Sequence, residues 1–333
     1  MKAWGYFTAH QLNDFAIKEV EVPDPDPGDG DLLVRIQAIS VNPVDYKIRR
    51  SRSSTTARPV ILGWDAVGEV VKTGARVTGF HVGDQIYYAG DLMRDGTNAE
   101  LHLVDHRLAA RKPKRFSATE AAALPLTALT AWEALLDQQA GMVEEDAKVL
   151  IVGGAGGVGS IAIQLLKAKT NAKVIATASR PETKAWCETM GPDLVIDHSK
   201  NLREELKRHD IAEVDTVFGI TQSQLYLGML PDIIRPFGRF VLIDDPGVLD
   251  IAHFKRKSIT VSWELMFTKS LFGYKPETQG KILAEVATLA DGGRLKPTVR
   301  EVLTGLSAET LRAAHTRLES AKTIGKIVID CCQ

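Results

Sequence analysis

The chain of 333 residues is long enough for two domains with separate hydrophobic cores. Its net charge of −1 gives no general reason to expect a nucleic acid or an anionic membrane surface as partner, and we expect neither. Its 3 cysteines form neither a disulfide framework nor a metal-ligand spacing. With no signal peptide and no apolar run long enough for a membrane span, these features predict a cytoplasmic protein.

The first part of the chain predicts β structure interrupted by glycines. Asn42 and Pro43 follow the third strand and begin a short helix. His102 and His106 have a spacing that suits zinc on a helix, but their segment alternates like a strand, which favours ordinary core or surface histidines. The strands expected here cover residues 2–7, 15–22, 32–41, 61–71 and 85–88.

Strands and helices alternate in the second part of the chain. Helices are expected over 117–123 and 128–138, with Pro125 between them. Six strands follow, at 149–152, 174–177, 194–196, 216–218, 238–243 and 259–263. This alternation predicts an α/β fold with a doubly wound parallel sheet. Two amphipathic helices and a last strand at 326–329 complete the chain.

A glycine-rich turn stands between the first of these strands and the next helix. Gly154, Gly156 and Gly159 form the pattern G-x-G-x-x-G, and Gly157 and Val158 lie inside it. One glycine permits the sharp turn, the second lets the backbone approach a pyrophosphate, and the third lets helix and strand pack closely. The turn therefore predicts a dinucleotide site, with phosphates at the helix N-terminus.

The end of the second strand indicates which nicotinamide cofactor binds. A site specific for NAD places an acidic residue there to hold the ribose hydroxyls. This chain has Ser179 and Arg180 instead, with Lys184 one turn later. A guanidinium group can bind a 2′-phosphate, so we predict NADPH as the cofactor.

Four motifs in this order resemble the medium-chain dehydrogenase/reductase superfamily. They are Gly63-x-Asp65-x-x-Gly68, Phe80-x-x-Gly83-Asp84, Thr127-Ala128-Leu129-Thr130-Ala131 and the glycine turn. The resemblance implies a GroES-like β-barrel catalytic domain over 1–122, a Rossmann domain over 123–265 and a C-terminal return to the catalytic domain over 266–333. It also implies an active site in the cleft between the domains.

The chain departs from the zinc-dependent members of that superfamily. Asn42, Trp64 and Leu126 stand where the zinc ligands are expected, and the four-cysteine loop of a structural zinc is absent from the sequence. The chain thus resembles the zinc-free quinone oxidoreductase-like branch, and we expect no metal. Its segments 263–267 and 323–328 resemble a bacterial subgroup labelled "zinc-type alcohol dehydrogenase-like".

The same resemblance assigns several further residues. It implies that Thr130 packs beside the nicotinamide, that His198 borders the adenosine end of the cofactor, and that Lys326 reaches the pyrophosphate. Trp64 and Trp263 are candidates for the walls of a substrate pocket, and core packing is the alternative for each.

The missing metal limits the chemistry that we expect. Without a Lewis acid, a simple ketone is poorly polarised, whereas a quinone or an α,β-unsaturated carbonyl can still accept hydride if hydrogen-bond donors hold its oxygen. Asn42, Tyr46 and Lys47 are the candidate catalytic residues. The alternative is that Asn42 only shapes the turn before Pro43 and that Tyr46 packs in the helix.

The sequence therefore predicts an NADPH-dependent quinone or enone reductase that acts on a small-molecule substrate. Two alternatives remain: a non-catalytic NADPH-binding sensor or structural protein on a reductase scaffold, and an alcohol dehydrogenase. We also expect a homodimer, joined through the edge strand at 259–263.

Overall fold

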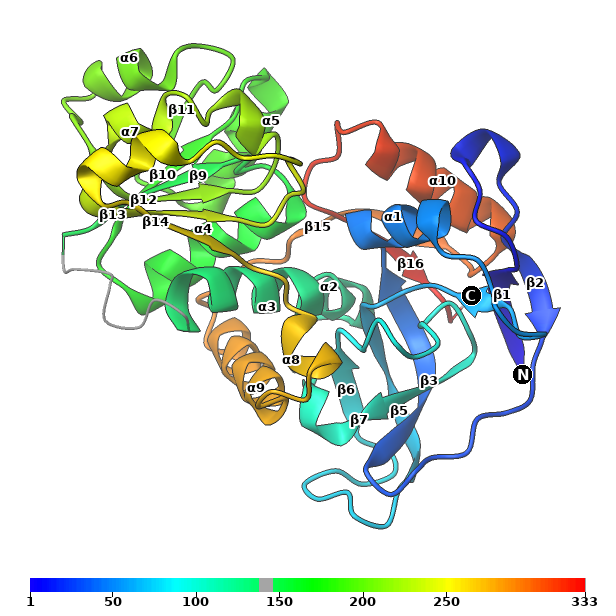
Figure 1. The fold of residues 1–333 in the computed structure, drawn as a ribbon. Helices are drawn as coiled ribbons and strands as arrows, with labels where there is room; N and C mark the ends of the chain where they lie inside the picture. Colours follow the sequence, from blue (N-terminus) through cyan, green and yellow to red (C-terminus); the bar gives the residue numbers. More distant parts are fainter. Residues whose placement is uncertain (138–145, 333) are drawn as a thin grey trace. The chain divides into compact units, whose positions relative to one another are not determined.

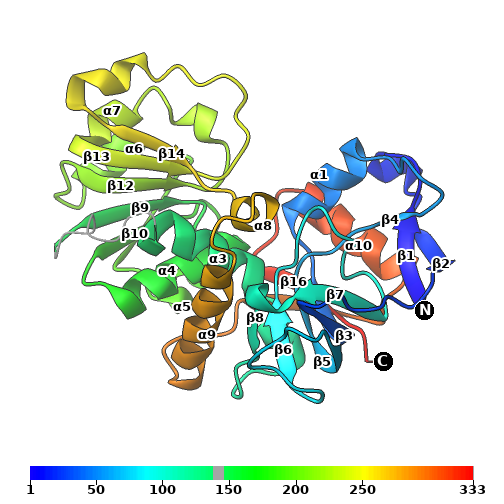
Figure 2. The same cartoon turned by 60° about the horizontal axis from the view of Figure 1, so that its bottom comes forward.

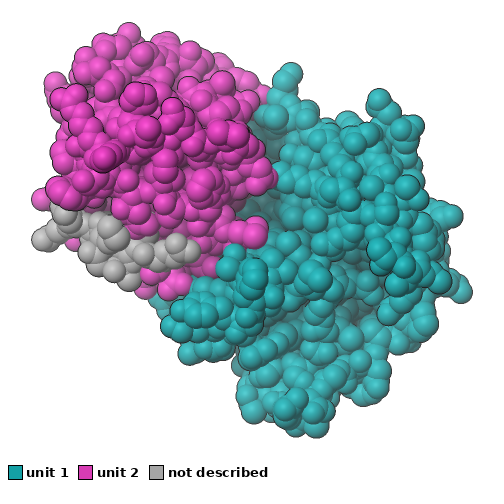
Figure 3. All heavy atoms as spheres, in the orientation of Figure 1, with its two compact units in different colours: residues 1–129, 267–293, 297–333 teal, residues 130–266, 294–296 magenta. Residues whose placement is uncertain are grey.

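The fold is described from a computed structural model, which places residues 1–137 and 146–332. The chain divides into two compact units (Figure 3). Unit 1 contains residues 1–129, 267–293 and 297–333, and unit 2 contains residues 130–266 and 294–296. We expected the first boundary after residue 122. Unit 1 instead continues to residue 129.

Unit 2 is built on a parallel six-stranded sheet in the order β11-β10-β9-β12-β13-β14 (Figure 1). This is the strand order of a doubly wound dinucleotide-binding fold, with the reversal between β9 and β12. All six strands were predicted to within a few residues. They are β9 (Lys148–Val152), β10 (Lys173–Thr177), β11 (Leu194–Ile196), β12 (Val214–Gly219), β13 (Ile234–Leu242) and β14 (Thr260–Trp263).

Helices cover both faces of this sheet. Figure 2 shows α4 and α5 below the sheet and α7 above it. Central strand residues such as Leu150, Val217 and Phe240 are fully or almost fully buried, which explains their continuous apolar runs in the sequence. The helices are α4 (Gly157–Lys169), α5 (Pro181–Met190), α6 (Leu202–Lys207) and α7 (Leu230–Ile233).

Unit 1 contains two sheets. A seven-stranded sheet runs β15-β16-β3-β5-β6-β8, with β7 paired to β3, and a three-stranded sheet runs β2-β1-β4. The strands described form an open path, not a closed barrel. Their bounds are β1 (Lys2–Tyr6), β2 (Lys18–Glu21), β3 (Asp31–Ser40), β4 (Val60–Ile61), β5 (Ala66–Thr73), β6 (Gln85–Tyr88), β7 (Leu101–Asp105), β8 (Ala109–Arg111), β15 (Val299–Thr304) and β16 (Lys326–Asp330).

The helices of unit 1 connect these strands. Pro125 begins α3 and does not merely separate two helices, because a proline at the first helical position loses no intrahelical hydrogen bond. A π-helical turn, Glu133–Asp137, follows α3, and the expected last residue of that helix, Gln138, lies outside the described residues. The helices are α1 (Pro43–Ser51), α2 (Ala118–Ala122), α3 (Pro125–Trp132), α8 (Thr268–Leu271), α9 (Glu277–Asp291) and α10 (Ala308–Glu319), and of these α3 continues into unit 2 from residue 130.

None of the helices in the described ranges has the length and apolar character that a membrane span requires.

Candidate functional site

The glycine turn of unit 2 lies between β9 and α4, as predicted. A Cβ on Gly154 would come within 2.8 Å of the Ala176 Cβ, and one on Gly159 would come within 2.4 Å of the Gly153 carbonyl oxygen. A Cβ on Gly156 would have no heavy atom closer than that carbonyl oxygen, at 3.7 Å. Packing therefore requires glycine at 154 and 159 but not at 156. The open space at Gly156 suits the approach of a phosphate, so the residues of this turn fit a dinucleotide.

The first turn of α4 presents backbone N–H groups to that space. Gly157 and Val158 are its first helical residues and are half-buried, and Gly156 caps the helix without a side-chain hydrogen bond. The Ser160 hydroxyl donates to the Gly156 carbonyl over 2.7 Å and accepts from the Trp186 indole over 2.8 Å. These bonds stabilise the helix end that would face the phosphates.

The residues predicted for the adenosine end lie where β10 and β11 finish. Ser179 and Arg180 follow β10, and the Arg180 Nε lies 3.3 Å from the Glu182 carboxylate, with 38% of the arginine side chain exposed. The Lys184 ammonium lies 3.4 Å from the Asp197 carboxylate. Two cationic side chains thus begin α5 next to the end of β10, in positions that suit a 2′-phosphate.

His198 is linked to the glycine turn through a residue that the sequence did not single out. The Thr177 hydroxyl lies 3.1 Å from His198 Nδ1 and accepts from the Gly153 N–H over 3.0 Å. Burial lowers the pKa of His198 and favours its neutral form. Thr177 therefore joins the ends of β10 and β11 to the glycine turn. The only feature of the sequence that could have indicated this role of Thr177 is its position as the last residue of β10.

In unit 1 the predicted residues Asn42 and Lys326 meet at Asp65. The Asn42 Nδ2 donates to Asp65 Oδ2 over 2.8 Å and to the Ser40 carbonyl oxygen over 3.3 Å. The Lys326 ammonium donates to Asp65 Oδ2 over 3.1 Å, to the Val41 carbonyl oxygen over 3.0 Å and to Asn42 Oδ1. We call these three side chains the Asn42–Asp65–Lys326 network. Their exposed fractions are 1%, 0% and 3%.

This network changes how Asn42 and Lys326 can act. All polar atoms of the Asn42 amide have partners inside unit 1, so neither Nδ2 hydrogen is left for a substrate oxygen. An ammonium group has three hydrogens, and Lys326 has three acceptors, so the geometry does not offer it to a pyrophosphate. The catalytic role of Asn42 and the pyrophosphate contact of Lys326 stay predictions. In the structure, both side chains instead form buried hydrogen bonds within unit 1.

Asp65 also holds the segment that contains Leu126. Its Oδ1 accepts from the Leu126 N–H over 2.7 Å. Burial raises the pKa of Asp65, and the Lys326 ammonium acts against that effect. Nearby, Asp45 accepts from the Asn42 N–H over 2.6 Å as part of the capping box of α1, and burial raises its pKa to about 7.

The residues at the three expected zinc positions do not fit a zinc ion. The side chains of Trp64 and Leu126 have no donor atom for the metal, and the Asn42 oxygen is bound to the cationic Lys326. Trp64 is buried, donates its indole N–H to the Asp91 carbonyl oxygen over 3.0 Å and packs edge-on against Phe267, with ring centroids 6.2 Å apart. Among residues 1–137 and 146–332, no cluster of at least three His, Cys, Asp or Glu side chains could hold a metal.

The remaining candidates differ in their surroundings. Tyr46 is half-buried in α1 beneath the Arg50 guanidinium, which lies 5.0 Å from the ring centroid, and the neighbouring Lys47 is exposed. Thr130 is buried in α3. Trp263 ends β14 with 54% of its surface exposed in unit 2, so within that unit it is not a buried pocket wall.

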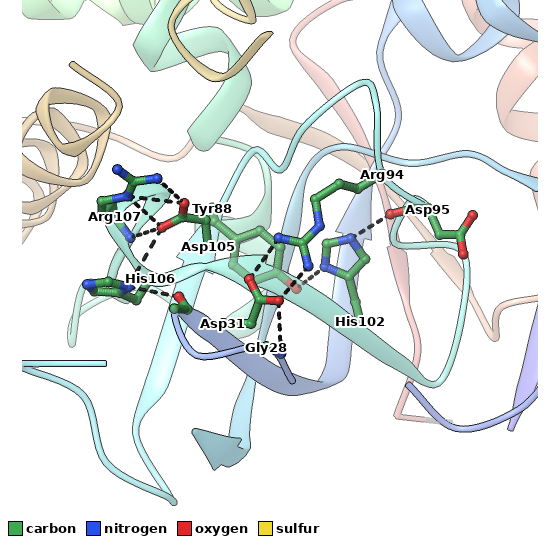
Figure 4. A network of polar contacts seen from close by, with 10 residues as sticks. Gly28, Asp31, Tyr88, Arg94, Asp95, His102, Asp105, His106 and Arg107 are labelled. Atoms are coloured by element: carbon green, nitrogen blue, oxygen red, sulfur yellow. Dashed lines mark hydrogen bonds and ion pairs between the residues drawn. The ribbon is translucent and has the colours of Figure 1, made fainter. Parts of the chain in front are cut away.

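His102 and His106 have separate partners. His102 lies in β7, stacks on Tyr88 and lies 3.1 Å from the Tyr88 hydroxyl and 2.8 Å from the Asp95 carbonyl oxygen (Figure 4). His106 lies 2.8 Å from the Gly30 carbonyl oxygen. Their predicted role as ordinary histidines agrees with these contacts.

Two family models match the chain. One, described as "Alcohol dehydrogenase GroES-like domain", matches residues 28–114, and the other, described as "Zinc-binding dehydrogenase", matches residues 190–329. The sequence is 39% identical to a zinc-type alcohol dehydrogenase-like protein of Staphylococcus aureus (strain MSSA476), across 99% of this chain and 100% of that protein. It is 30% identical to the 2-methylene-furan-3-one reductase of Solanum lycopersicum, across 99% of this chain and 79% of that enzyme.

Solved structures have the same fold. A putative zinc-dependent alcohol dehydrogenase protein from Rhizobium etli CFN 42 superposes with a TM-score of 0.97 at 46% identity, covering 100% of this chain and 98% of that one. The quinone oxidoreductase of Escherichia coli complexed with NADPH superposes with a TM-score of 0.84 at 24% identity, covering 99% and 100%. At that identity the second likeness concerns the fold alone.

Proposed function

Because the chain belongs to the medium-chain dehydrogenase/reductase superfamily of oxidoreductases, we propose that it is an NADPH-dependent reductase of quinones or α,β-unsaturated carbonyls. We propose further that it works without zinc, in the cytoplasm. The observation that carries this proposal is the Asn42–Asp65–Lys326 network, which places a buried ammonium and a buried carboxylate against the side chain of Asn42, one of the three expected metal positions.

The network supports zinc independence through its charge. A dication at this place would have to displace Lys326 from Asn42 and Asp65, and the carboxylate would then be shared between two cations. The Lys326 ammonium already offsets the negative charge of Asp65. It also joins the segment that contains Asn42 to the segment that contains Asp65. No donor set for zinc is left, because the side chains of Trp64 and Leu126 have no atom that can coordinate the metal.

The cofactor part of the proposal rests on unit 2. The space at Gly156 suits a pyrophosphate, and Arg180 and Lys184 suit the 2′-phosphate that distinguishes NADPH from NADH. When bound, NADPH would supply a hydride to a quinone carbonyl or to the β-carbon of an enone, and NADP⁺ would be the product. One proton from the surrounding groups or from water completes the reduction. The tomato relative is named a reductase, which agrees with this direction.

The substrate oxygen needs hydrogen-bond donors other than Asn42. Tyr46 and Lys47 lie in the first turns of α1, which begins at the residue after the capping residue Asn42. We propose that one of them donates to the oxygen on which negative charge develops, and that the network acts through the position of α1. Loss of a donor of this kind commonly lowers kcat by roughly a hundred- to a thousandfold.

A panel of acceptors tests the proposal. NADPH oxidation, followed by its absorbance, is expected with a para-quinone and a conjugated enone, and hardly at all with a saturated ketone. Tyr46→Phe and Lys47→Met identify the donor, since one of them should lower kcat while NADPH affinity is kept. Metal analysis of the active protein should find no stoichiometric zinc.

The two alternatives predict different results in the same assays. A non-catalytic NADPH-binding protein would bind the cofactor and reduce no acceptor. An alcohol dehydrogenase would oxidise a primary alcohol with NADP⁺ at a comparable rate and would lose that activity to a chelator. Either result would replace the proposal.

A further inference from the structure

Two neighbouring cysteines near the end of the chain have no role in the site described above. Cys331 and Cys332 directly follow β16, and both are free thiols, the first half-buried and the second exposed. The remaining cysteine, Cys187, is buried in α5 of unit 2. Because adjacent residues can present both sulfur atoms to one small ligand, Cys331 and Cys332 form a vicinal dithiol.

Strand β3 holds this pair in a defined place. The Cys331 N–H donates to the Gln37 carbonyl oxygen over 2.9 Å, which extends the ladder between β16 and β3 by one residue beyond Asp330. The Cys332 thiol donates to the same carbonyl oxygen over 3.6 Å, and the Cys331 thiol donates to the Ile329 carbonyl oxygen over 3.6 Å. A thiol is a weak donor, so a ligand that bonds to sulfur can displace these contacts at little cost.

The geometry of the pair is unfavourable for a disulfide. The peptide bond between Cys331 and Cys332 is trans, which sets their Cα atoms about 3.8 Å apart. A relaxed disulfide needs Cα atoms roughly 4.4–6.8 Å apart. A ligand atom placed between the two sulfur atoms relieves this mismatch, because it lets them lie farther apart than a direct S–S bond does.

Both thiols stay protonated near neutral pH. Burial, followed by electrostatic repulsion from Cys332 and Asp330, raises the pKa of Cys331 to about 12. Partial burial of its sulfur, followed by repulsion from Asp330, also raises the pKa of Cys332. Oxidants and most soft metal ions react with the thiolate form, so both are disfavoured here. In the described part of the chain, no cluster of three His, Cys, Asp or Glu side chains completes a metal site.

Trivalent arsenic has the chemistry that suits a protonated vicinal dithiol. An organic arsenous acid, R–As(OH)₂, condenses with two thiols. Two As–S bonds form, two As–O and two S–H bonds break, and each thiol proton leaves with a hydroxyl group as water. The arsenic stays trivalent, so the step needs neither an oxidant nor a reductant. The second As–S bond forms at a high effective concentration, because both thiols belong to one site.

We propose that Cys331 and Cys332 form a binding site for trivalent arsenicals, in which the arsenic atom bridges the two sulfur atoms. This activity is independent of the proposed reductase. Lys326 begins β16, whereas the two cysteines follow its last residue, so an adduct at the cysteines leaves the Asn42–Asp65–Lys326 network intact.

Mass spectrometry of the folded chain treated with phenylarsine oxide tests this inference. In water this compound hydrates to an arsenous acid of the kind described. We expect one phenylarsenic bridge per chain, in place of two thiol hydrogens, on the peptide that contains Cys331 and Cys332. A small dithiol should remove the bridge, whereas glutathione, a monothiol, should not remove it at the same concentration.

Single substitutions separate a bridge from attachment to one thiol. Cys332→Ser changes an exposed residue, so it should fold normally. We expect it to weaken arsenical binding by roughly a hundred- to ten-thousandfold, the advantage of two linked contacts over one. Cys331→Ser should have the same effect. Cys187→Ala is the matched control, because it removes a cysteine outside the pair, and it should leave the adduct unchanged.

The possible results separate this inference from the proposed function. No adduct on the unmodified folded chain would overturn the inference. An adduct that maps to Cys187, or one that both serine variants keep at full affinity, would also overturn it. NADPH binding is measured without the arsenical and the adduct forms without NADPH, so failure of one leaves the other standing.

Discussion

Lys326 is the residue on which the buried network of unit 1 depends. Lys326→Met would keep most of the side-chain volume but would leave the Asp65 carboxylate buried without its ammonium partner. Breaking a buried ion pair on one side typically costs about 3–5 kcal/mol of stability. We expect a loss of that size in the free energy of unfolding, measured with urea.

The double variant Lys326→Met/Asp65→Asn is the control for this prediction. It removes both charges, so it should recover a large part of the loss, because no unpaired charge is then buried. An equal loss in the single and double variants would mean that the charge of Lys326 is not what stabilises the network.

Arg180 is the residue expected to bind the 2′-phosphate of NADPH. A guanidinium–phosphate contact is worth about 1.5–3 kcal/mol, so Arg180→Ala should weaken NADPH by roughly ten- to hundredfold and leave NADH nearly unchanged. Fluorescence titration with both cofactors measures the difference. Glu182→Gln is the companion variant, because it removes the carboxylate that lies 3.3 Å from Arg180, and it should strengthen NADPH slightly. An equal loss for both cofactors in Arg180→Ala would assign the arginine a structural role.

At the scale of single residues, the sequence predicts which residues belong to the site better than it predicts which residues they contact. Gly154, Gly156 and Gly159 could be predicted with their separate roles, because each role follows from a local pattern. The partners of Lys326 could not. Asn42 and Asp65 lie 284 and 261 residues away along the chain, and no local pattern relates residues at such distances.

At the scale of elements, α1 is held in place by its contact with α10. The Arg49 guanidinium is completely buried and donates to His315 Nδ1 over 3.0 Å and to the Glu319 carboxylate over 2.6 Å. Because Nδ1 accepts this bond, His315 must be neutral. Burial, followed by the charge of Arg49, lowers its pKa to about 3. The helix that carries Tyr46 and Lys47 is thus anchored through a histidine that resists protonation.

This contact predicts a pH dependence of stability. The unfolded chain protonates His315 near its ordinary pKa of 6.5, whereas the folded chain does so only near 3. The unfolded state therefore binds more protons between these values, and His315 lowers the free energy of unfolding as pH falls from 6.5 toward 3. The slope from one such group approaches about 1.4 kcal/mol per pH unit.

The variant His315→Asn isolates that contribution. Asparagine offers an acceptor oxygen near the position of Nδ1 and does not titrate. Urea unfolding of both proteins between pH 7 and pH 4 gives the difference between them. His102, with its pKa lowered to about 4, and Asp45, with its pKa raised to about 7, cancel in this difference because both proteins contain them. Parallel stability profiles would contradict the assignment.

The elements of unit 2 could be predicted more closely than those of unit 1. Buried parallel strands are continuous apolar runs, so all six had clear signals. In unit 1 the expected strand over 61–71 is two strands, β4 and β5, separated by the segment that holds Trp64 and Asp65. Its glycines indicated an interruption, but the tertiary contacts of Asp65 set its place.

At the scale of the whole molecule, the fold and family could be predicted, because four motifs in a fixed order extend over much of the chain. The limits of the units could be predicted only in part. Residues 294–296 belong to unit 2 although the chain on both sides belongs to unit 1. The cause is a long-range contact: Gln164 in α4 accepts from the Lys296 N–H over 2.7 Å, which no local pattern encodes.

The expected homodimer stays a prediction, and β14 is the surface that we assign to it. In the part of the chain that the structure describes, this strand is the edge of the six-stranded sheet of unit 2, and an edge strand can pair with a further strand. Trp263 at its end is 54% exposed, and Leu265 just beyond it is 51% exposed. Two copies related by a twofold axis can pair β14 with β14 and cover both side chains at once.

Light scattering should therefore give twice the mass of one chain. Trp263→Lys should shift the equilibrium toward the monomer, because it places like charges at the contact. Phe272→Lys is the matched control, since Phe272 is 79% exposed but lies in unit 1. A monomeric mass for the unmodified protein, or equal dissociation in the two variants, would show that β14 is not the interface.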